Sequence, residues 1–288
     1  MKTAIITDSG SSLSEQQAKE LGIFYLPLQV MNGTETLLDG VDLDQRMIYQ
    51  FLHEEADLST SQPPIGILES VVQDIKKQGY DEAVAVTICP GLSSTMSTLQ
   101  ARCKYMELPL YAVNTFTTCF VEQYLAVSAK KLADQGMCGT DIKARLEASI
   151  SHSDTLIVPD DLQHLKRGGR LTPLAAALGG LLKIKPILKL NASSEGKIDV
   201  FAKVRTMSKA LQMTVDTFKE ADLDERYILY VLHTDASIEG RKFYEQMKEA
   251  FPLTEIVFDH IGPVISVHTG IGCMGAQYIR KVDFKDNL

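Results

Sequence analysis

Short hydrophobic runs alternate with amphipathic segments along the first half of the chain. The runs occupy residues 3–7, 24–31, 83–88 and 110–113. Each is too short for an ordinary helix, so each predicts a strand. Between them, hydrophobic side chains recur at helical spacing, as at Leu68, Val72 and Ile75. Strands that alternate with helices are typical of a parallel sheet covered by helices, so this half predicts an α/β domain.

Hydroxyl side chains stand where several of these helices should begin. Ser12 and Glu15 have the spacing of a capping box, which predicts a helix through about Leu21. Hydroxyl-rich segments at residues 59–61 and 91–95 likewise precede hydrophobic positions at helical spacing. The predicted helices after these caps cover residues 65–79 and 96–106, and a further one covers residues 121–132.

The second half repeats this alternation after residue 151. Its predicted strands cover residues 155–158, 184–190, 198–204, 227–232, 255–258 and 264–269. Its predicted helices cover residues 174–182, 206–221 and 237–251. A chain of 288 residues is long enough for two domains of ordinary size. We therefore expect two α/β domains, over residues 1–150 and 151–288.

Residues 270–275 read Gly-Ile-Gly-Cys-Met-Gly and match the dinucleotide-binding pattern G-x-G-x-x-G. Only thirteen residues follow Gly275, which leaves no room for the βαβ unit that such a site requires. Tyr278 and Ile279 suit a closing strand better than a helix start. We expect these glycines to let the backbone approach a ligand or the first domain closely.

The composition, with 45% hydrophobic and 23% charged residues, is that of a soluble globular protein. The N-terminus reaches Asp8 after three apolar residues, too few for a signal peptide, so the expected location is cytoplasmic. The cysteines are odd in number and scattered, and the histidines lack metal-ligand spacing. Neither a disulfide framework nor a metal site is predicted.

The net charge of −8 is unevenly distributed. Residues 166–209 carry ten basic and two acidic side chains, a charge of +8, which leaves −16 on the remainder. This asymmetry favours an acidic protein partner or a small anion. Nucleic acid ranks lower, because the stretch has one aromatic residue, Phe201, for stacking and the rest of the chain repels phosphates. A solvated basic face remains open.

Within this stretch, residues 165–173 read Leu-Lys-Arg-Gly-Gly-Arg-Leu-Thr-Pro and predict a basic loop. Thr172 is a predicted N-cap and Pro173 the first residue of the following helix. Guanidinium groups, glycine backbone and a helix start all favour an anion such as carboxylate or phosphate. In a parallel sheet the hydroxyl-rich segments share one rim, where Ser93 and the Ser94 backbone N–H are placed to hold an oxyanion.

His268 stands at the end of the strand predicted over residues 264–269, directly before the glycines. A lone histidine is more often structural than functional. A catalytic triad with Ser93 is conceivable, although the sequence lacks a nucleophile elbow G-x-S-x-G. A serine-dependent acyl hydrolase that uses Ser93 and His268 is therefore an alternative.

Five ordered motifs together resemble the DegV family of bacterial fatty-acid-binding proteins. They are Thr-Asp-Ser at residues 7–9, Thr-Ser-Gln-Pro at 60–63, Gly-Leu-Ser-Ser-Thr at 91–95, Leu-Lys-Arg-Gly-Gly-Arg-Leu at 165–171, and Ile-Gly-Pro-Val at 261–264 leading to His-Thr-Gly-Ile-Gly at 268–272. The resemblance implies a two-domain DegV-like α/β fold, with an N-terminal parallel sheet, a mixed sheet in the second domain and a fatty acid between them. The chain departs from the family pattern at residues 89–90, 114–118 and 271.

The resemblance also implies roles for individual residues. Thr60 and Ser93 would bind the fatty acid carboxylate, with Ser94, His268 and Arg170 beside it. Arg205 would serve kinase docking or phosphoryl transfer. Part of the acyl tunnel wall would come from leucines at positions 171, 174, 178, 181 and 182.

The function so implied is that of a lipid carrier without turnover of its own. It would present a bound long-chain fatty acid to a separate fatty acid kinase, which makes an acyl phosphate for phospholipid synthesis. No cofactor, nucleic acid or stable membrane insertion is expected, and the protein should be a monomer. Besides the acyl hydrolase, an anion-binding regulatory module remains a second alternative.

Overall fold

A computed structural model of the protein describes residues 2–178 and 184–282. The first half contains a four-stranded parallel sheet with the order β2-β1-β6-β7. These strands are β1 (Thr3–Asp8), β2 (Phe24–Leu26), β6 (Glu82–Thr87) and β7 (Leu110–Asn114). The predicted strand over residues 24–31 is divided in two, because Pro27 cannot donate a ladder hydrogen bond.

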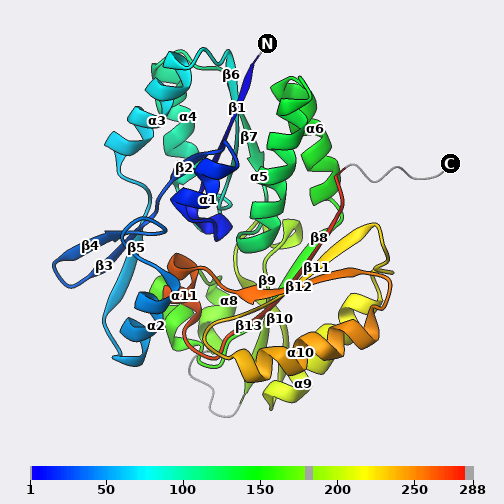
Figure 1. Ribbon diagram of the computed structural model, residues 1–288. Coiled ribbons are helices and arrows are strands. Elements are labelled where there is room, and N and C mark those ends of the chain that lie inside the picture. The colour runs from blue at the N-terminus through cyan, green and yellow to red at the C-terminus, as the bar shows by residue number, and fades with distance from the viewer. Residues whose placement is uncertain (1, 179–183, 283–288) are drawn as a thin grey trace.

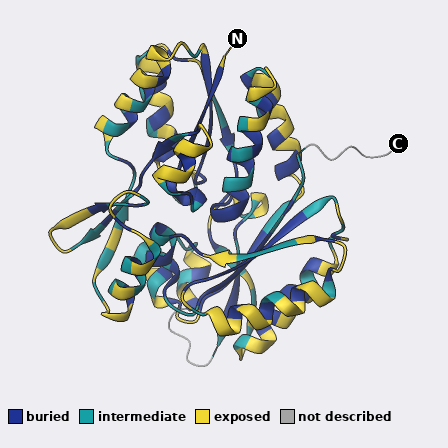
Figure 2. Cartoon of the chain, in the orientation of Figure 1, coloured by how far each residue is buried: buried dark blue, intermediate teal, exposed yellow. Residues whose placement is uncertain are grey.

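Helices cover both faces of this sheet, because its strands are hydrophobic at successive positions that point to opposite faces (Figure 1). Ala4 and Ile6 of β1 pack with α3 (Ile65–Lys77) and α4 (Thr95–Tyr105). Ile5 instead packs with α5 (Cys119–Asp134) and α6 (Gly139–Ile150). In Figure 2 the central strands β1 and β6 are accordingly dark blue, while the outer faces of the helices are yellow.

The helix boundaries correct three predictions of caps. Helix α1 (Glu15–Glu20) is capped by Ser14 and Gln17, whereas Ser12 has a φ of 62°, which excludes it as the cap. The hydroxyls of residues 59–61 lie in strand β5 (Leu58–Ser61), and α3 begins after Pro64 without a side-chain cap. Ser94 precedes α4 without forming a side-chain cap hydrogen bond.

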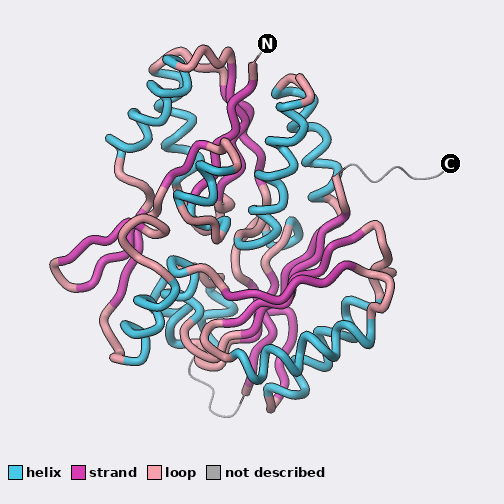
Figure 3. The backbone as a smooth tube through the Cα atoms, viewed as in Figure 1, coloured by secondary structure: helices cyan, strands magenta, loops and turns pink. Residues whose placement is uncertain are grey.

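The second half contains a six-stranded mixed sheet in which only β11 and β12 are parallel. Its order is β10 (Asp199–Val204), β9 (Lys185–Lys189), β8 (Ser153–Val158), β13 (Met274–Arg280), β11 (Tyr227–His233) and β12 (Glu255–His260). Helices α9 (Met207–Lys219) and α10 (Ser237–Ala250) cover one face (Figure 3). Tyr278 and Ile279 lie in a strand, as the sequence predicts, and this last strand, β13, is inserted between β8 and β11.

The opposite face of the second sheet contacts the first half directly. One hydrophobic cluster contains Val121 and Leu125 of α5 together with Ile157 of β8 and Tyr230 of β11. The ring of Phe120 lies 5.6 Å from that of Tyr230. Because this core is continuous, the division after residue 150 stays a proposal, although α6 ends at Ile150 and β8 begins at Ser153.

The predicted strand over residues 264–269 is wrong, since this segment is helix α11 (Pro263–Thr269). Pro263 occupies the first helical turn, and the Gly270 N–H closes the helix on the Ser266 carbonyl at 2.9 Å. Buried residues lie on several sides of α11, so its sequence lacks the alternation of a surface helix. Its continuous run of Val, Ile and Val is what made it resemble a buried strand.

The segment predicted as a basic loop contains a second short helix, α7 (Gln163–Gly168), which ends at Gly169 with a φ of 70°. Thr172 is the N-cap of α8 (Pro173–Ala177), as predicted, and accepts a hydrogen bond from the Ala175 N–H. The remainder of the helix predicted over residues 174–182 lies outside the described residues from position 179 onward. The short 3₁₀ helices are η1 (Ser9–Ser11) and η3 (Ala192–Ser194).

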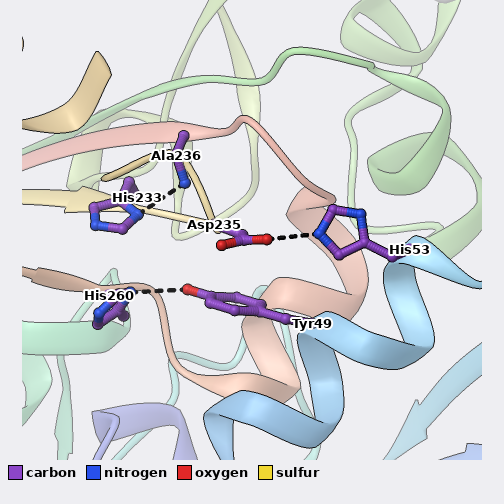
Figure 4. A network of polar contacts seen from close by, with 6 residues as sticks. All are labelled: Tyr49, His53, His233, Asp235, Ala236 and His260. Atoms are coloured by element: carbon purple, nitrogen blue, oxygen red, sulfur yellow. Dashed lines mark hydrogen bonds and ion pairs between the residues drawn. The ribbon is translucent and has the colours of Figure 1, made fainter. Parts of the chain in front are cut away.

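An arm between β2 and α3 reaches from the first sheet to the second. It holds a small sheet of β3 (Gln29–Asn32), β4 (Glu35–Leu38) and β5, together with α2 (Gln45–His53). Helix α2 packs on α11 through Ile48 and Leu52, which share a cluster with Val264 and Val267. Figure 4 shows the polar contacts of α2: Tyr49 hydrogen-bonds His260 at 2.9 Å, and His53 contacts Asp235 at 2.6 Å.

Candidate functional site

A cavity of about 480 Å³, here called the main cavity, lies between the rim of the first sheet and the second half of the chain. The first half supplies Leu28, Ile88 and residues 60–62, 90–94 and 118, and the second half supplies Ile157, Leu165, Arg170, Leu190, Ile198 and residues of α11. Its position is that expected for ligands of parallel sheets, beyond the carboxyl ends of the strands.

All five residues that the sequence suggests for the carboxylate site, four by their side chains and Ser94 by its backbone, line the main cavity. Thr60 comes from β5, Ser93 and Ser94 from the loop before α4, Arg170 from the segment after α7, and His268 from the last turn of α11. Arg205 is not among the lining residues and lies exposed just after β10. The structure thus brings five of the six predicted residues together and leaves Arg205 apart.

His268 is half-buried and pairs with Thr60, because its Nε2 lies 2.8 Å from the Thr60 Oγ1. Burial, assisted by Arg170 and His164, lowers the pKa of His268 to about 4, so the ring is neutral near pH 7. Nδ1 is buried without a partner. An unpaired acceptor costs less than an unpaired N–H, so we assign the proton to Nε2, which donates to Thr60. The Thr60 hydroxyl hydrogen is then free for a ligand.

Ser93 does not pair with His268. Its Oγ lies 2.9 Å from the Thr95 Oγ1 and accepts a hydrogen bond from the Thr95 N–H at 3.3 Å. Since the His268 Nε2 is occupied by Thr60, no base among the described residues contacts the serine. Nucleophilic catalysis requires such a contact, so this geometry does not favour the serine hydrolase alternative.

Gln62 is a lining residue whose role the sequence reasoning missed. Its Oε1 accepts hydrogen bonds from the Ser94 Oγ at 3.0 Å and the Thr98 Oγ1 at 2.7 Å, so it ties β5 to the start of α4. Its only signal in the sequence is its place within the motif at residues 60–63. Arg170 makes a comparable link, donating from Nε to the Leu92 carbonyl at 3.2 Å.

The deeper wall of the main cavity is hydrophobic. Five of its residues, Thr118, Ile157, Leu190, Ile265 and Thr269, also line a small adjoining cavity of about 30 Å³. The leucines predicted for the tunnel wall do not line the main cavity where the structure describes them. Leu171, Leu174 and Leu178 are not among the residues that line the main cavity, and positions 181 and 182 lie outside the described residues.

Below the cavity, Asp8 of β1 and Glu122 of α5 form a buried carboxyl pair. Asp8 accepts hydrogen bonds from the backbone N–H groups of Gly10 at 2.9 Å and Ile88 at 3.3 Å, which fixes the start of the loop that carries Ser93. Burial raises the pKa of Asp8 to about 6 and that of Glu122 well above its usual range. Glu122 therefore keeps its proton when Asp8 releases its own, so the pair carries one buried charge rather than two.

We predict that Gly168→Ala weakens ligand retention about tenfold. A Cβ at residue 168 would lie 2.1 Å from the His268 Nδ1, and the ring could move away only by breaking its bond to Thr60. Isothermal titration with a fatty acid would measure the loss. The matched control is Gly66→Ala on α3, where an added Cβ meets nothing within 4 Å. Equal affinities for the two variants would contradict the prediction.

Among the residues that the structure describes, no group of three or more His, Cys, Asp or Glu side chains is placed to hold a metal ion. Within the same residues, no helix has the length and hydrophobicity that crossing a bilayer requires.

The sequence and the fold match one family throughout. A family model described as "Uncharacterised protein, DegV family" covers residues 2–281. A DegV domain-containing protein of Streptococcus pneumoniae is 31% identical, over 97% of this chain and 99% of its own length.

Two crystal structures are similar over nearly their full length. DegV of Bacillus subtilis, described as a fatty acid binding protein, has a TM-score of 0.87 and 29% identity over 98% of this chain and 100% of its own. A fatty acid binding DegV family protein of Streptococcus agalactiae has a TM-score of 0.87 and 30% identity, over 98% and 99%. The match confirms the two-sheet α/β fold that the motifs implied, and this chain belongs to the DegV family.

Proposed function

We propose that this protein binds a long-chain fatty acid in the main cavity and presents its carboxylate to a separate fatty acid kinase. The observation that carries the proposal is the division of the cavity into a hydrophobic interior and a polar end. Ile157, Leu190 and Ile265 suit an acyl chain. Ser93 and the Thr60 hydroxyl, which His268 orients, suit a carboxylate. Relatives of the same fold are described as fatty acid binding proteins.

The polar end suits a carboxylate that is to react later. A carboxylate removed from water needs several hydrogen-bond donors. Hydroxyl groups provide donors without an ion pair. The guanidinium of Arg170 at this end already donates to the Leu92 and Gly168 carbonyls, so the anion is not bound too tightly to act as a nucleophile. In the proposed reaction a carboxylate oxygen forms a bond to the γ-phosphorus of ATP on the kinase. The bond to ADP breaks, and an acyl phosphate results.

The basic face of the second half is the proposed docking surface for the kinase. Arg205 and Lys203 are exposed there, on and after β10, and neither lines the main cavity. We propose that the carrier itself turns over no substrate, requires no cofactor, and acts as a cytoplasmic monomer that supplies acyl phosphate for phospholipid synthesis.

Native mass spectrometry of the protein purified from cells tests the binding function. A stoichiometric adduct with the mass of a fatty acid, identified after lipid extraction, is the expected result. Purified protein without lipid that also fails to take up added fatty acid would contradict the proposal. Salt-sensitive binding to nucleic acid in place of lipid would favour the regulatory alternative.

Ser93→Ala and Arg205→Ala should separate ligand binding from kinase recognition. We expect Ser93→Ala to weaken fatty acid retention about fivefold, because one donor to the carboxylate is lost. Arg205→Ala should leave retention unchanged and slow the kinase-dependent phosphorylation of bound fatty acid. Titration and a coupled kinase assay measure the two effects, and equal loss of binding in both variants would refute this division.

A further inference from the structure

A second cavity, of about 300 Å³ and here called the outer cavity, adjoins the polar end of the main cavity. Thr60, Arg170 and His268 line both cavities, so these three side chains form the boundary between them. The rest of the outer cavity is formed by residues 56–59 before and on β5, Leu52 of α2, Val267 of α11, and His164, Arg167 and Gly168 of α7.

The outer cavity differs from the main cavity in charge. Two guanidinium groups, Arg167 and Arg170, line it, and within residues 2–178 and 184–282 neither forms an ion pair with a carboxylate. The carboxylate that lines it is Asp57, which is exposed. His164 lies 3.4 Å from an Arg167 nitrogen, and burial together with Arg167 lowers the pKa of His164. Two cations therefore face one anion beside a neutral histidine.

The two positive charges that line the outer cavity are more than one carboxylate needs. At the boundary the Thr60 hydroxyl and one guanidinium, that of Arg170, can donate to a ligand, which suffices for the single negative charge of a carboxylate in the main cavity. An acyl phosphate carries its phosphoryl group one bond beyond the carboxyl oxygen, and that group brings up to two negative charges. Phosphoryl oxygens are matched by guanidinium groups, which donate two parallel hydrogen bonds.

We propose that the outer cavity is a phosphoryl site, in which Arg167 and Arg170 hold the phosphoryl group of an acyl phosphate while the acyl chain stays in the main cavity. The proposal rests on the proposed function, since it assumes an acyl chain in the main cavity. It assigns to Arg167 a role that binding of the unmodified fatty acid does not require.

Two ligands of the same acyl chain test this site by isothermal titration. One is the free fatty acid, and the other is its β-ketophosphonate, a stable analogue in which CH₂ replaces the bridging oxygen of the acyl phosphate. Arg167→Gln should weaken binding of the β-ketophosphonate about tenfold and change fatty acid affinity by less than about twofold. Lys166→Gln, which removes an exposed neighbouring cation outside both cavities, is the matched control and should change neither.

Competition by inorganic phosphate shows whether the outer cavity binds the free anion or only a phosphoryl group that is joined to an acyl chain. If phosphate alone competes with the β-ketophosphonate in wild type and not in Arg167→Gln, the outer cavity also binds the free anion, which supports the assignment. Equal loss of both ligands in Arg167→Gln, or of neither, would contradict the phosphoryl site while leaving the proposed function intact. A wild-type protein that binds neither ligand would contradict both.

Discussion

Glu122→Gln is expected to make the protein more stable than wild type by about 3 kcal/mol near pH 8, and to lose most of this advantage near pH 5. Glu122 is fully buried on α5, and its side chain faces Asp8 at the end of β1. The other ionisable groups around the pair are acids: Asp39 also lies close, and the thiols of Cys89 and Cys119 have pKa values raised to about 12 by burial. No cation offsets the charge of the pair among these neighbours.

The sign follows from the direction of the shifts. Burial raises the pKa of Glu122 above its value in the unfolded chain, so its contribution to stability is present at low pH and disappears as the pH rises. Near pH 8 the unfolded chain releases this proton, while the folded chain must keep it or bear a buried charge. Glutamine has nearly the shape of the protonated acid and carries no proton that the unfolded chain can release. It therefore removes the cost of keeping that proton in the folded state at high pH.

Chemical denaturation of both proteins near pH 5 and pH 8 would measure the difference. Comparison with wild type is essential, because burial lowers the pKa values of His233 and His268 to about 4. These histidines make the folded state less stable as the pH falls below about 6.5, whereas the buried acids make it less stable as the pH rises. The histidine contribution is the same in both proteins, so it cancels in the comparison. Glu225→Gln, at an exposed carboxylate, should change stability by no more than about 0.5 kcal/mol at either pH. A difference between Glu122→Gln and wild type that does not change with pH would show that folding does not raise the pKa of Glu122.

Most of the site could be predicted from the sequence because it depends on topology. Once β1 and β6 are recognised as parallel strands, the segments that follow them must share one rim, which places Ser93 there. Thr172 and Pro173 are a local signal that tertiary packing did not override. The roles of Thr60 and His268 came instead from resemblance, since neither a hydroxyl on a strand nor a single histidine is distinctive by itself.

The wrong secondary-structure predictions have two causes. Some segments are buried on several sides and so lack helical periodicity, and elsewhere two neighbouring residues could both act as the helix cap. Helix α11 packs against α2 and α7, so its hydrophobic run carries no helical pattern. Ser12 and Ser14 both offer a cap, and the left-handed backbone of Ser12 decides between them. The exposed β3–β4 hairpin of the arm was missed. The close approach of Gly168 to His268 depends on two segments a hundred residues apart, which no local pattern reports.

Gly91→Ala is expected to destabilise the protein by about 3 kcal/mol and to lower its melting temperature by about 6–12 °C. The Gly91 backbone contacts the turn between β9 and β10, so a Cβ there would lie 2.0 Å from the Gly196 carbonyl oxygen. The obstacle is backbone, so no side-chain rotation relieves the overlap. Gly196 itself has a φ of 68° and accepts a hydrogen bond from the Cys89 thiol at 3.3 Å, which leaves little freedom on its side.

The same contact couples stability to ligand binding, which makes the variant informative beyond its melting temperature. Separation of the loop at residues 89–94 from the turn at Gly196 would move Ser93 away from His268 and open the main cavity between them. Fatty acid retention should therefore fall more than tenfold in Gly91→Ala, whereas Gly66→Ala should melt and bind as wild type does. Unchanged melting in Gly91→Ala would mean that the two segments do not touch in solution. The gap between the loop at residues 89–94 and the second half of the chain would then be wider than the structure describes. Residues on the two sides of the main cavity could not then hold the carboxylate at the same time.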